Sequence, residues 1–95
     1  MRALVLPLLI ASSPALAAAE PGCKVTLKQF SEIRVGGGVP SLYQRAGCRG
    51  TVVSETALPG SRTRMEQWDG TEPGSLMHVY IENGWVRNKT QIGLR

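Results

Sequence analysis

A group of aromatic and cationic side chains carries the clearest binding chemistry in this sequence. Several of them lie close together around the dipeptide Asn83-Gly84. Aromatic rings and arginine are enriched at the residues that dominate the energy of protein interfaces. An alternative interpretation is that Trp85 only covers one end of the fold, or packs with Trp68, and binds nothing. The candidate binding residues are Tyr43, Trp68, Tyr80, Trp85 and Arg87.

Catalytic and metal-binding constellations are not recognisable in the sequence. His78 is the single histidine, and no Gly-x-Ser-x-Gly motif is present, so a nucleophile activated by a neighbouring base cannot be assembled. Glu66, Asp69 and Glu72 lie in or beside a turn rich in glycine and proline, where we expect water to surround them. The sequence therefore predicts a protein that is not an enzyme and that uses no cofactor or metal ion.

The N-terminus and the cysteines indicate an exported protein. Residues 1–19 have the basic start, short apolar run and Ala-x-Ala ending of a cleaved signal peptide. Cleavage after Ala19 would leave one small domain, residues 20–95, with no further membrane insertion. Cys23 and Cys48 are the only two cysteines, and an even number in an exported chain favours a disulfide. We therefore expect a secreted or periplasmic protein, with Cys23 bonded to Cys48.

The segment Leu76–Thr90 predicts a β-hairpin that turns at Asn83-Gly84, because both central residues of a type I′ turn need positive φ. A two-residue turn would pair Ile81 with Val86 and then Tyr80 with Arg87. Side chains alternate along a strand, so the two faces of the hairpin separate. We expect a core face made of Met77, Val79, Ile81 and Val86. The opposite, exposed face would carry His78, Tyr80, Trp85, Arg87 and Lys89.

Other short segments read as strands separated by glycine and proline turns. Alternation predicts strands at 23–28 and 64–68, and β-branched residues predict one at 51–56. Leu58-Pro59-Gly60-Ser61 has the composition of a type II turn. Gly36 to Ser41 is expected to be an irregular loop, with at most one helical turn before Gly47. These segments predict an all-β fold, a barrel or a sandwich.

The order of these motifs resembles the bacterial SH3-like (SH3b) family. The resemblance rests on Ile33-Arg34-Val35-Gly36, Tyr43, Gly50-Thr51-Val52-Val53 and Gly84-Trp85-Val86. It implies a small five-stranded SH3-like barrel that serves as a recognition module for cell-wall peptide or a protein partner. A second resemblance, to small periplasmic protease inhibitors, rests on Pro59-Gly60, Met65-Glu66 and the segment 79–84.

The expected function is therefore an exported binding module that meets its partner through the aromatic and cationic surface. In the alternative, a protease inhibitor, the exposed loop from Ala57 to Thr63 would imitate a substrate. The chain has eleven Lys and Arg against seven Asp and Glu, but the two signs are interspersed, which argues against nucleic acid as a partner. We expect the module to be a monomer.

Overall fold

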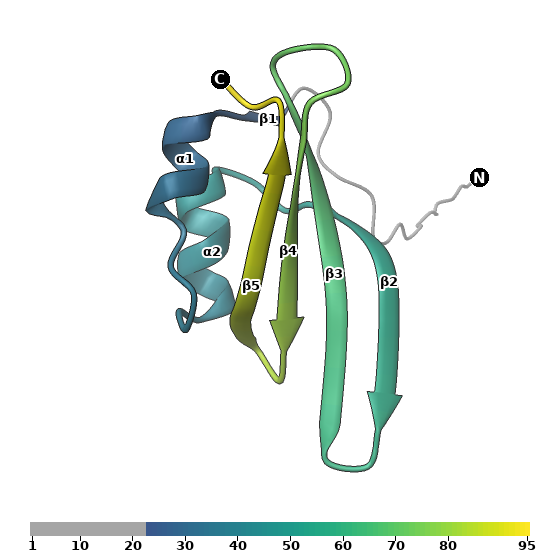
Figure 1. Cartoon of the computed structure of the whole chain (residues 1–95). Coiled ribbons are helices and arrows are strands. Elements are labelled where there is room, and N and C mark those ends of the chain that lie inside the picture. The colour runs from purple at the N-terminus through teal and green to yellow at the C-terminus, as the bar shows by residue number, and fades with distance from the viewer. Residues whose placement is uncertain (1–22) are drawn as a thin grey trace, which may run out of the picture.

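The computed structural model describes residues 23–95, in which five strands form one curled sheet, a half-barrel, with two helices beside it (Figure 1). The predicted signal peptide, residues 1–19, lies outside the described residues. The prediction of an all-β fold with five strands is confirmed for the sheet, which the two helices accompany. None of the described helices is long and apolar enough to cross a membrane. In chain order the elements are β1 (Lys24–Val25), α1 (Leu27–Glu32), α2 (Val39–Ala46), β2 (Thr51–Leu58), β3 (Ser61–Gly70), β4 (Leu76–Glu82) and β5 (Trp85–Ile92).

Strand β3 is the centre of the sheet. It pairs antiparallel with β2 on one side and with β4 on the other, and β4 pairs antiparallel with β5. The short β1 pairs parallel with the last residues of β3, opposite Asp69 and Gly70. Four of these strands were predicted from the sequence, at 51–56, at 64–68 and as the two strands of the hairpin within 76–90. All four are present, and β2, β3 and β5 extend beyond the predicted bounds.

The β4–β5 hairpin turns where it was predicted to turn. Asn83 and Gly84 both have positive φ, at 52° and 86°, as a type I′ turn requires. Ile81 pairs with Val86 as expected, but Tyr80 pairs with Asn88 and not with Arg87. Arg87 is thus the extra residue of a β-bulge, and every later residue of β5 is shifted to the opposite face from the predicted one.

The first predicted strand is much shorter than expected, because a helix replaces its second half. The Thr26 side chain accepts a hydrogen bond from the backbone N–H of Gln29, and the Gln29 side chain accepts one from the Thr26 N–H. This reciprocal arrangement is a capping box, which satisfies two N–H groups that a helix start leaves unpaired. Helix α1 therefore begins directly after Thr26, where alternation alone had suggested that the strand continues.

The predicted irregular loop after Gly36 also becomes helical sooner than expected. Helix α2 begins at Val39, with Pro40 in its first turn, a position at which proline loses no helical hydrogen bond. It ends at Gly47, whose φ of 84° lies in the left-handed region that glycine adopts most easily. The helix is longer than the single turn that the sequence suggested, and its end was predicted correctly.

The core lies between the helices and one face of the sheet. Met77, Val79, Ile81 and Val86 are all at most 2% exposed, which confirms the predicted core face of the hairpin. Trp68 is the largest side chain among the buried residues, and its indole N–H donates to the carbonyl oxygen of Cys48 at 3.1 Å. The remaining core residues are Val25, Ile33, Leu42, Ala46, Cys48 and Leu94.

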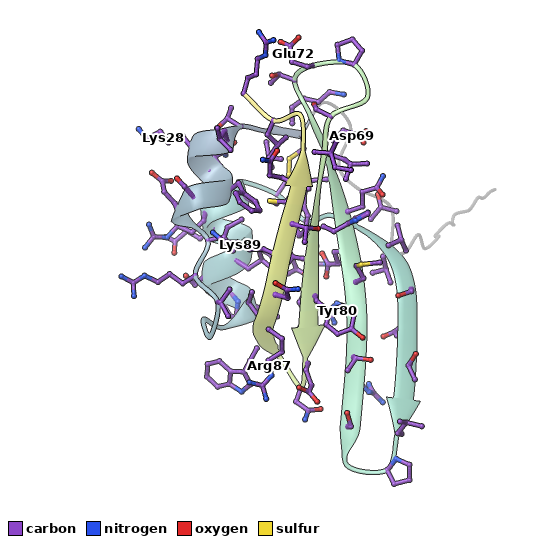
Figure 2. The ribbon with its side chains drawn as sticks, viewed as in Figure 1. Lys28, Asp69, Glu72, Tyr80, Arg87 and Lys89 are labelled. Atoms are coloured by element: carbon purple, nitrogen blue, oxygen red, sulfur yellow. A yellow bond between two sulfur atoms is a disulfide. The ribbon has the colours of Figure 1, made fainter. Side chains whose placement is uncertain are left out.

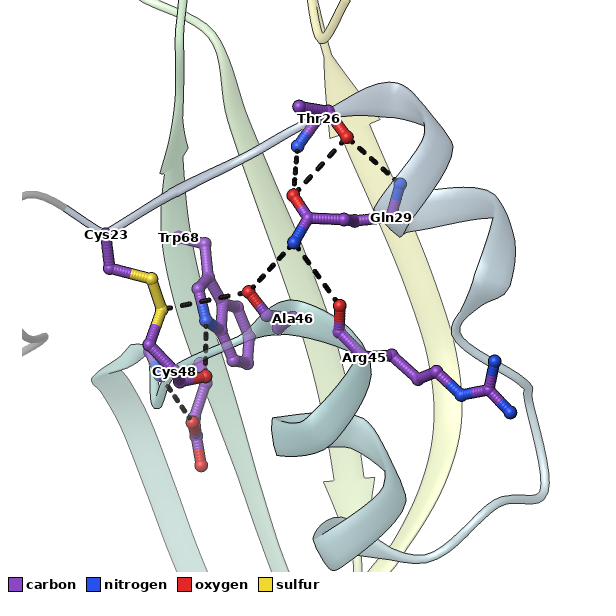
Figure 3. The surroundings of a disulfide bond; sticks show 9 residues. Cys23, Thr26, Gln29, Arg45, Ala46, Cys48 and Trp68 are labelled. Atoms are coloured by element: carbon purple, nitrogen blue, oxygen red, sulfur yellow. Dashed lines mark hydrogen bonds between the residues drawn. A yellow bond between two sulfur atoms is a disulfide. The ribbon is translucent and has the colours of Figure 1, made fainter.

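The predicted disulfide between Cys23 and Cys48 is present (Figure 3). It joins the start of β1 to the connection between α2 and β2. Beside it, the side-chain amide of Gln29 donates to the carbonyl oxygens of Arg45 and Ala46 at the end of α2. The disulfide and Gln29 thus hold the two helices and β1 together at one end of the sheet.

Gly50 is a position where any larger residue should be costly. A Cβ atom there would lie 2.8 Å from Cδ2 of Trp68 and 2.9 Å from the carbonyl oxygen of Gln67, so ring and backbone would have to move. We expect Gly50→Ala to lower the free energy of unfolding by about 2–3 kcal/mol, the upper range for overpacking. Urea titration with circular dichroism measures this. Gly38→Ala is the control, because its Cβ would make only ordinary contacts; equal losses would contradict the expectation.

Candidate binding surface

One face of the sheet has no helix packed on it, because both described helices contact the other face through the core. We call this uncovered side the open face. The strand pairing places Met65, Tyr80 and Asn88 in one row across it, and Gln67, His78 and Thr90 in the next. Tyr80 is 44% exposed and Ile92 is 65% exposed. The residues of the open face on β3, β4 and β5 are Thr63, Met65, Gln67, His78, Tyr80, Glu82, Trp85, Asn88, Thr90 and Ile92.

Three of the five candidate binding residues lie at the hairpin end of the sheet: Tyr80 and Trp85 belong to the open face, and Arg87, the extra residue of the bulge, lies beside them. Trp85 is 55% exposed, and its ring lies 3.7 Å from where a Cβ of Gly38 would be, at the rim of the sheet. The Arg87 guanidinium donates to Glu82 at 2.8 Å and stays largely in solvent. Figure 2 shows Tyr80 and Arg87 on the β4–β5 hairpin. The ion pair is exposed and contributes at most about 1 kcal/mol, so little free energy holds Arg87 to Glu82.

A shallow hollow of about 80 Å³ adjoins Tyr80 on the open face. The ring Nε2 of His78, one of its lining residues, lies 2.8 Å from the side-chain oxygen of Gln67, which fixes the orientation of both side chains. A small apolar side chain of a partner would fit in such a hollow. The sequence interpretation missed it, because its lining comes from three strands: Met65, His78, Tyr80, Asn88, Lys89 and Thr90.

Lys89 lines the hollow beside Tyr80, but its side-chain ammonium group does not lie on the exposed face on which it was predicted. After the bulge at Arg87 it pairs with Val79, and its ammonium group donates to the carbonyl oxygen of Phe30 in α1 at 2.6 Å. The same ammonium group lies 4.4 Å from the centre of the Phe30 ring, a cation–π distance. Figure 2 shows Lys89 directed toward the helices. Its charge therefore fastens α1 to β5 and is not offered to a partner.

Two other candidates lie away from the open face. Trp68 is 1% exposed, so the prediction that it contributes to a binding surface is corrected: it is a core residue. Tyr43 lies in α2 on the helix side, packed against the core. Its hydroxyl donates to the Glu66 carboxylate at 2.6 Å and accepts from the Arg64 guanidinium at 2.9 Å. Tyr43 therefore joins α2 to the sheet.

Glu66 was expected in water and is instead 1% exposed. Its carboxylate accepts hydrogen bonds from the Tyr43 hydroxyl, the Gly50 backbone N–H and the Arg64 guanidinium. A buried carboxylate is tolerated only when it is paired and hydrogen-bonded in this way. Asp69 and Glu72 are exposed, as predicted. The alternation of β3 contains the missed information, since it puts Glu66 on the same side as the buried Trp68.

Removing the charge of Glu66 should weaken the fold without unfolding it. In Glu66→Gln, an amide N–H₂ replaces one carboxylate oxygen and faces a donor, while the Arg64 charge loses its partner. We expect the free energy of unfolding to fall by about 2–3 kcal/mol. Chemical denaturation of the variant measures this. Glu72→Gln, an exposed acid in the β3–β4 loop, is the matched control and should change stability by less than about 0.5 kcal/mol; a similar loss in both variants would argue against the role of the network.

The same network predicts how stability depends on alkaline pH. Burial, followed by the hydrogen bond to Glu66, raises the pKa of the Tyr43 phenol above its ordinary value of about 10. The folded protein therefore holds this proton more tightly than the unfolded chain does. The resulting stability is complete below about pH 10 and is lost as pH rises through the folded pKa. We expect Tyr43→Phe to flatten the loss of stability above pH 10 in urea titrations; an unchanged slope would refute this.

A second, larger hollow of about 370 Å³ lies at the opposite end of the sheet, along the β3–β4 loop. It is lined by the loop, including Glu72, and by Asp69 of β3 and Lys24 of β1. Within residues 23–95, no three His, Cys, Asp or Glu side chains come together in a group that could hold a metal ion. The loop hollow thus lacks both aromatic anchors and a ligand set.

Comparison with known proteins places this geometry in a family. A family model described as "Beta-lactamase inhibitor (BLIP)" matches residues 26–95. The chain belongs to the BLIP family. A solved structure from Streptococcus mutans, described as a "putative beta-lactamase inhibitor protein", matches 85% of this chain with a TM-score of 0.67 and 19% sequence identity. The chain covers 52% of that structure, so it spans about half its length. No curated protein matches.

Membership of the BLIP family corrects the resemblance to SH3-like domains. The family match covers the same residues that had suggested SH3b motifs. The physical reason is visible in the helices: the Ile33–Gly36 motif leads out of α1, and Tyr43 lies inside α2, where an SH3-like barrel was expected to place a loop. The family is named for inhibitors of an enzyme, and the match gives no support to the recognition of cell-wall peptide that the SH3-like resemblance implied.

Proposed function

We propose that this protein is an exported inhibitor that binds a β-lactamase through the hairpin end of its open face. The observation that carries the proposal is an uncovered sheet face with Tyr80 and Trp85 at 44% and 55% exposure, in a chain of the BLIP family. Large aromatic side chains left in water cost free energy that a partner surface recovers by covering them. Arg87 adds a charge at the same place.

The open face suits a folded partner better than an extended peptide. A sheet face offers side chains, and its backbone groups are already paired within the sheet. The hollow beside Tyr80 holds only a small side chain, so binding depends on a broad surface with a few anchors. Such a surface blocks an enzyme by covering the entrance to its active site and needs no chemistry of its own.

The disulfide supports a location outside the cytoplasm. Disulfides persist in oxidising compartments, which include the bacterial periplasm and the extracellular space. A β-lactamase inhibitor would meet its partner in those compartments. The signal peptide prediction for residues 1–19 agrees with this proposal.

An inhibition titration tests the proposal. Purified protein is titrated, up to about 100 μM, into a panel of purified β-lactamases that hydrolyse a chromogenic cephalosporin. We expect stoichiometric loss of hydrolysis for at least one enzyme, with reversal on dilution. As a control for nonspecific loss, the same titration uses protein whose disulfide has been reduced and alkylated. If no enzyme of the panel is inhibited or bound, the β-lactamase part of the proposal fails.

A further inference from the structure

Strand β2 forms an edge of the sheet whose outer side no described strand or helix covers. It pairs with β3 on one side only, and Figure 1 shows it as the strand furthest from the two helices. The residues from Val53 to Leu58 are exposed. An unpaired edge presents a row of N–H and C=O groups that can pair with another strand.

The opposite edge of the sheet is protected, which makes β2 different. At the start of β5, the N–H of Gly36 donates to the Val86 carbonyl and the Val86 N–H donates to the Gly37 carbonyl. The bulge at Arg87 further bends that edge. Strand β2 also has a bulge, between Val52 and Ser54, but its outer half from Ser54 to Leu58 pairs regularly with β3 and has no lysine and no proline, two of the residues that block edge pairing. Glu55 is the one charged residue of that half. Val53 and Leu58 are 44% and 64% exposed.

The residues of β2 favour one way of pairing with a second copy. An antiparallel pair related by a two-fold axis perpendicular to the sheet keeps the same face of both sheets on one side. If the two-fold axis passed beside Glu55, the Glu55 carboxylates of the two copies would face each other. If it passed beside Ser54, the β-bulge between Val52 and Ser54 would lie within the paired segment. A centre at Thr56 avoids both and pairs threonine with threonine, which is a favourable cross-strand pair.

Charge complementarity supports the same register. With Thr56 at the centre, Ala57 of one copy lies beside Glu55 of the other. Arg62 pairs with Ala57 across β3 and β2, so Arg62 and the second copy's Glu55 are separated only by a small side chain. Two strand spacings amount to about 10 Å, which an arginine and a glutamate reach together. Within the described residues, neither side chain has a recorded partner of its own.

We propose that this protein forms a two-fold symmetric dimer by antiparallel pairing of β2 with β2 of a second copy, joined by two Arg62–Glu55 ion pairs. The dimer joins the two sheets into one and doubles the width of the open face. This replaces the monomer expected from the sequence, and it does not depend on the identity of the inhibited enzyme.

Two charge reversals test the proposal together. In a dimer of the Glu55→Arg variant, position 62 of one copy and position 55 of the other would both carry arginine. In a dimer of the Arg62→Glu variant, the same two positions would both carry glutamate. We expect each variant alone to dimerise at least about tenfold more weakly than the unchanged protein, because like charges then oppose each other. An equimolar mixture of the two variants should recover dimers, because both new contacts are complementary. Sedimentation velocity between about 1 μM and 1 mM measures all four samples.

The control is Glu32→Arg, which reverses an exposed charge in α1 and should leave dimerisation unchanged. Circular dichroism of every variant verifies the fold. Monomers of the unchanged protein up to about 1 mM would overturn the proposal. Dimers that tolerate both single reversals, or a mixture that stays monomeric, would equally overturn it by excluding this register.

Discussion

Replacing Tyr80 and Trp85 together by alanine is expected to lower the affinity for a β-lactamase partner by at least about 100-fold. Each side chain is an exposed aromatic anchor on the open face, and truncation of such an anchor typically costs about 2 kcal/mol or more. That cost corresponds to roughly 30-fold for each single variant. The combined effect is not expected to be additive, because the two residues share one end of the surface. Inhibition titrations with the purified enzyme measure the change.

The matched control for this experiment is Leu27→Ala. Leu27 is 43% exposed, close to the 44% of Tyr80, but it lies in α1 on the far side of the sheet. Its removal should change affinity by less than about twofold, since it lies outside the open face. Equal losses at Leu27 and at the two aromatic residues would show that the surface has been placed on the wrong side of the molecule.

Removing the disulfide has the largest expected effect on stability. The bond closes a loop with a sequence separation of 25 residues, and the chain-entropy relation then gives about 3.5 kcal/mol. That is a large part of the total stability of so small a domain, which is typically about 5 kcal/mol or slightly more. We expect Cys23→Ser with Cys48→Ser to lower the urea midpoint strongly and to leave a partly unfolded population at 37 °C.

Reductant provides the control for the disulfide. Addition of a reducing agent should lower the midpoint of the unchanged protein to nearly that of the double variant and should not affect the variant itself. Since Trp68 donates to the carbonyl oxygen of Cys48, its fluorescence should follow the same transition. A double variant with the stability of the unchanged protein would contradict the stabilising role of the bond.

The structural features that depend only on residues close together in the chain were predicted correctly from the sequence. Local rules about φ predict the Asn83-Gly84 turn and the end of α2 at Gly47. Alternation along the strand predicts the buried face that contains Met77 and Val79. The disulfide followed from the number of cysteines and the export pattern. These features need no knowledge of what packs against them, which is why they were confirmed.

The missed features depend on tertiary contacts. The bulge at Arg87 places the Lys89 side chain on the helix side, where its ammonium group contacts the carbonyl oxygen and the ring of Phe30. No local sequence pattern predicts this bulge. Glu66 looked solvated because acids usually are, whereas Tyr43, Gly50 and Arg64 come from other parts of the chain to surround it. The exception is α1: the capping box of Thr26 and Gln29 is visible in the sequence and predicts a helix start, whereas the alternation of residues 23–28 favours a strand.

The two tryptophans allow the most direct test of binding through the open face. Trp85 is 55% exposed at the rim of that face, and Trp68 is 1% exposed in the core. Their indole N–H signals in a nitrogen-15 spectrum therefore report on the surface and on the interior of the same molecule. During titration with an inhibited β-lactamase, we expect the Trp85 signal to shift or broaden far more than the Trp68 signal. Binding that leaves Trp85 unchanged would contradict the open face as the site of contact.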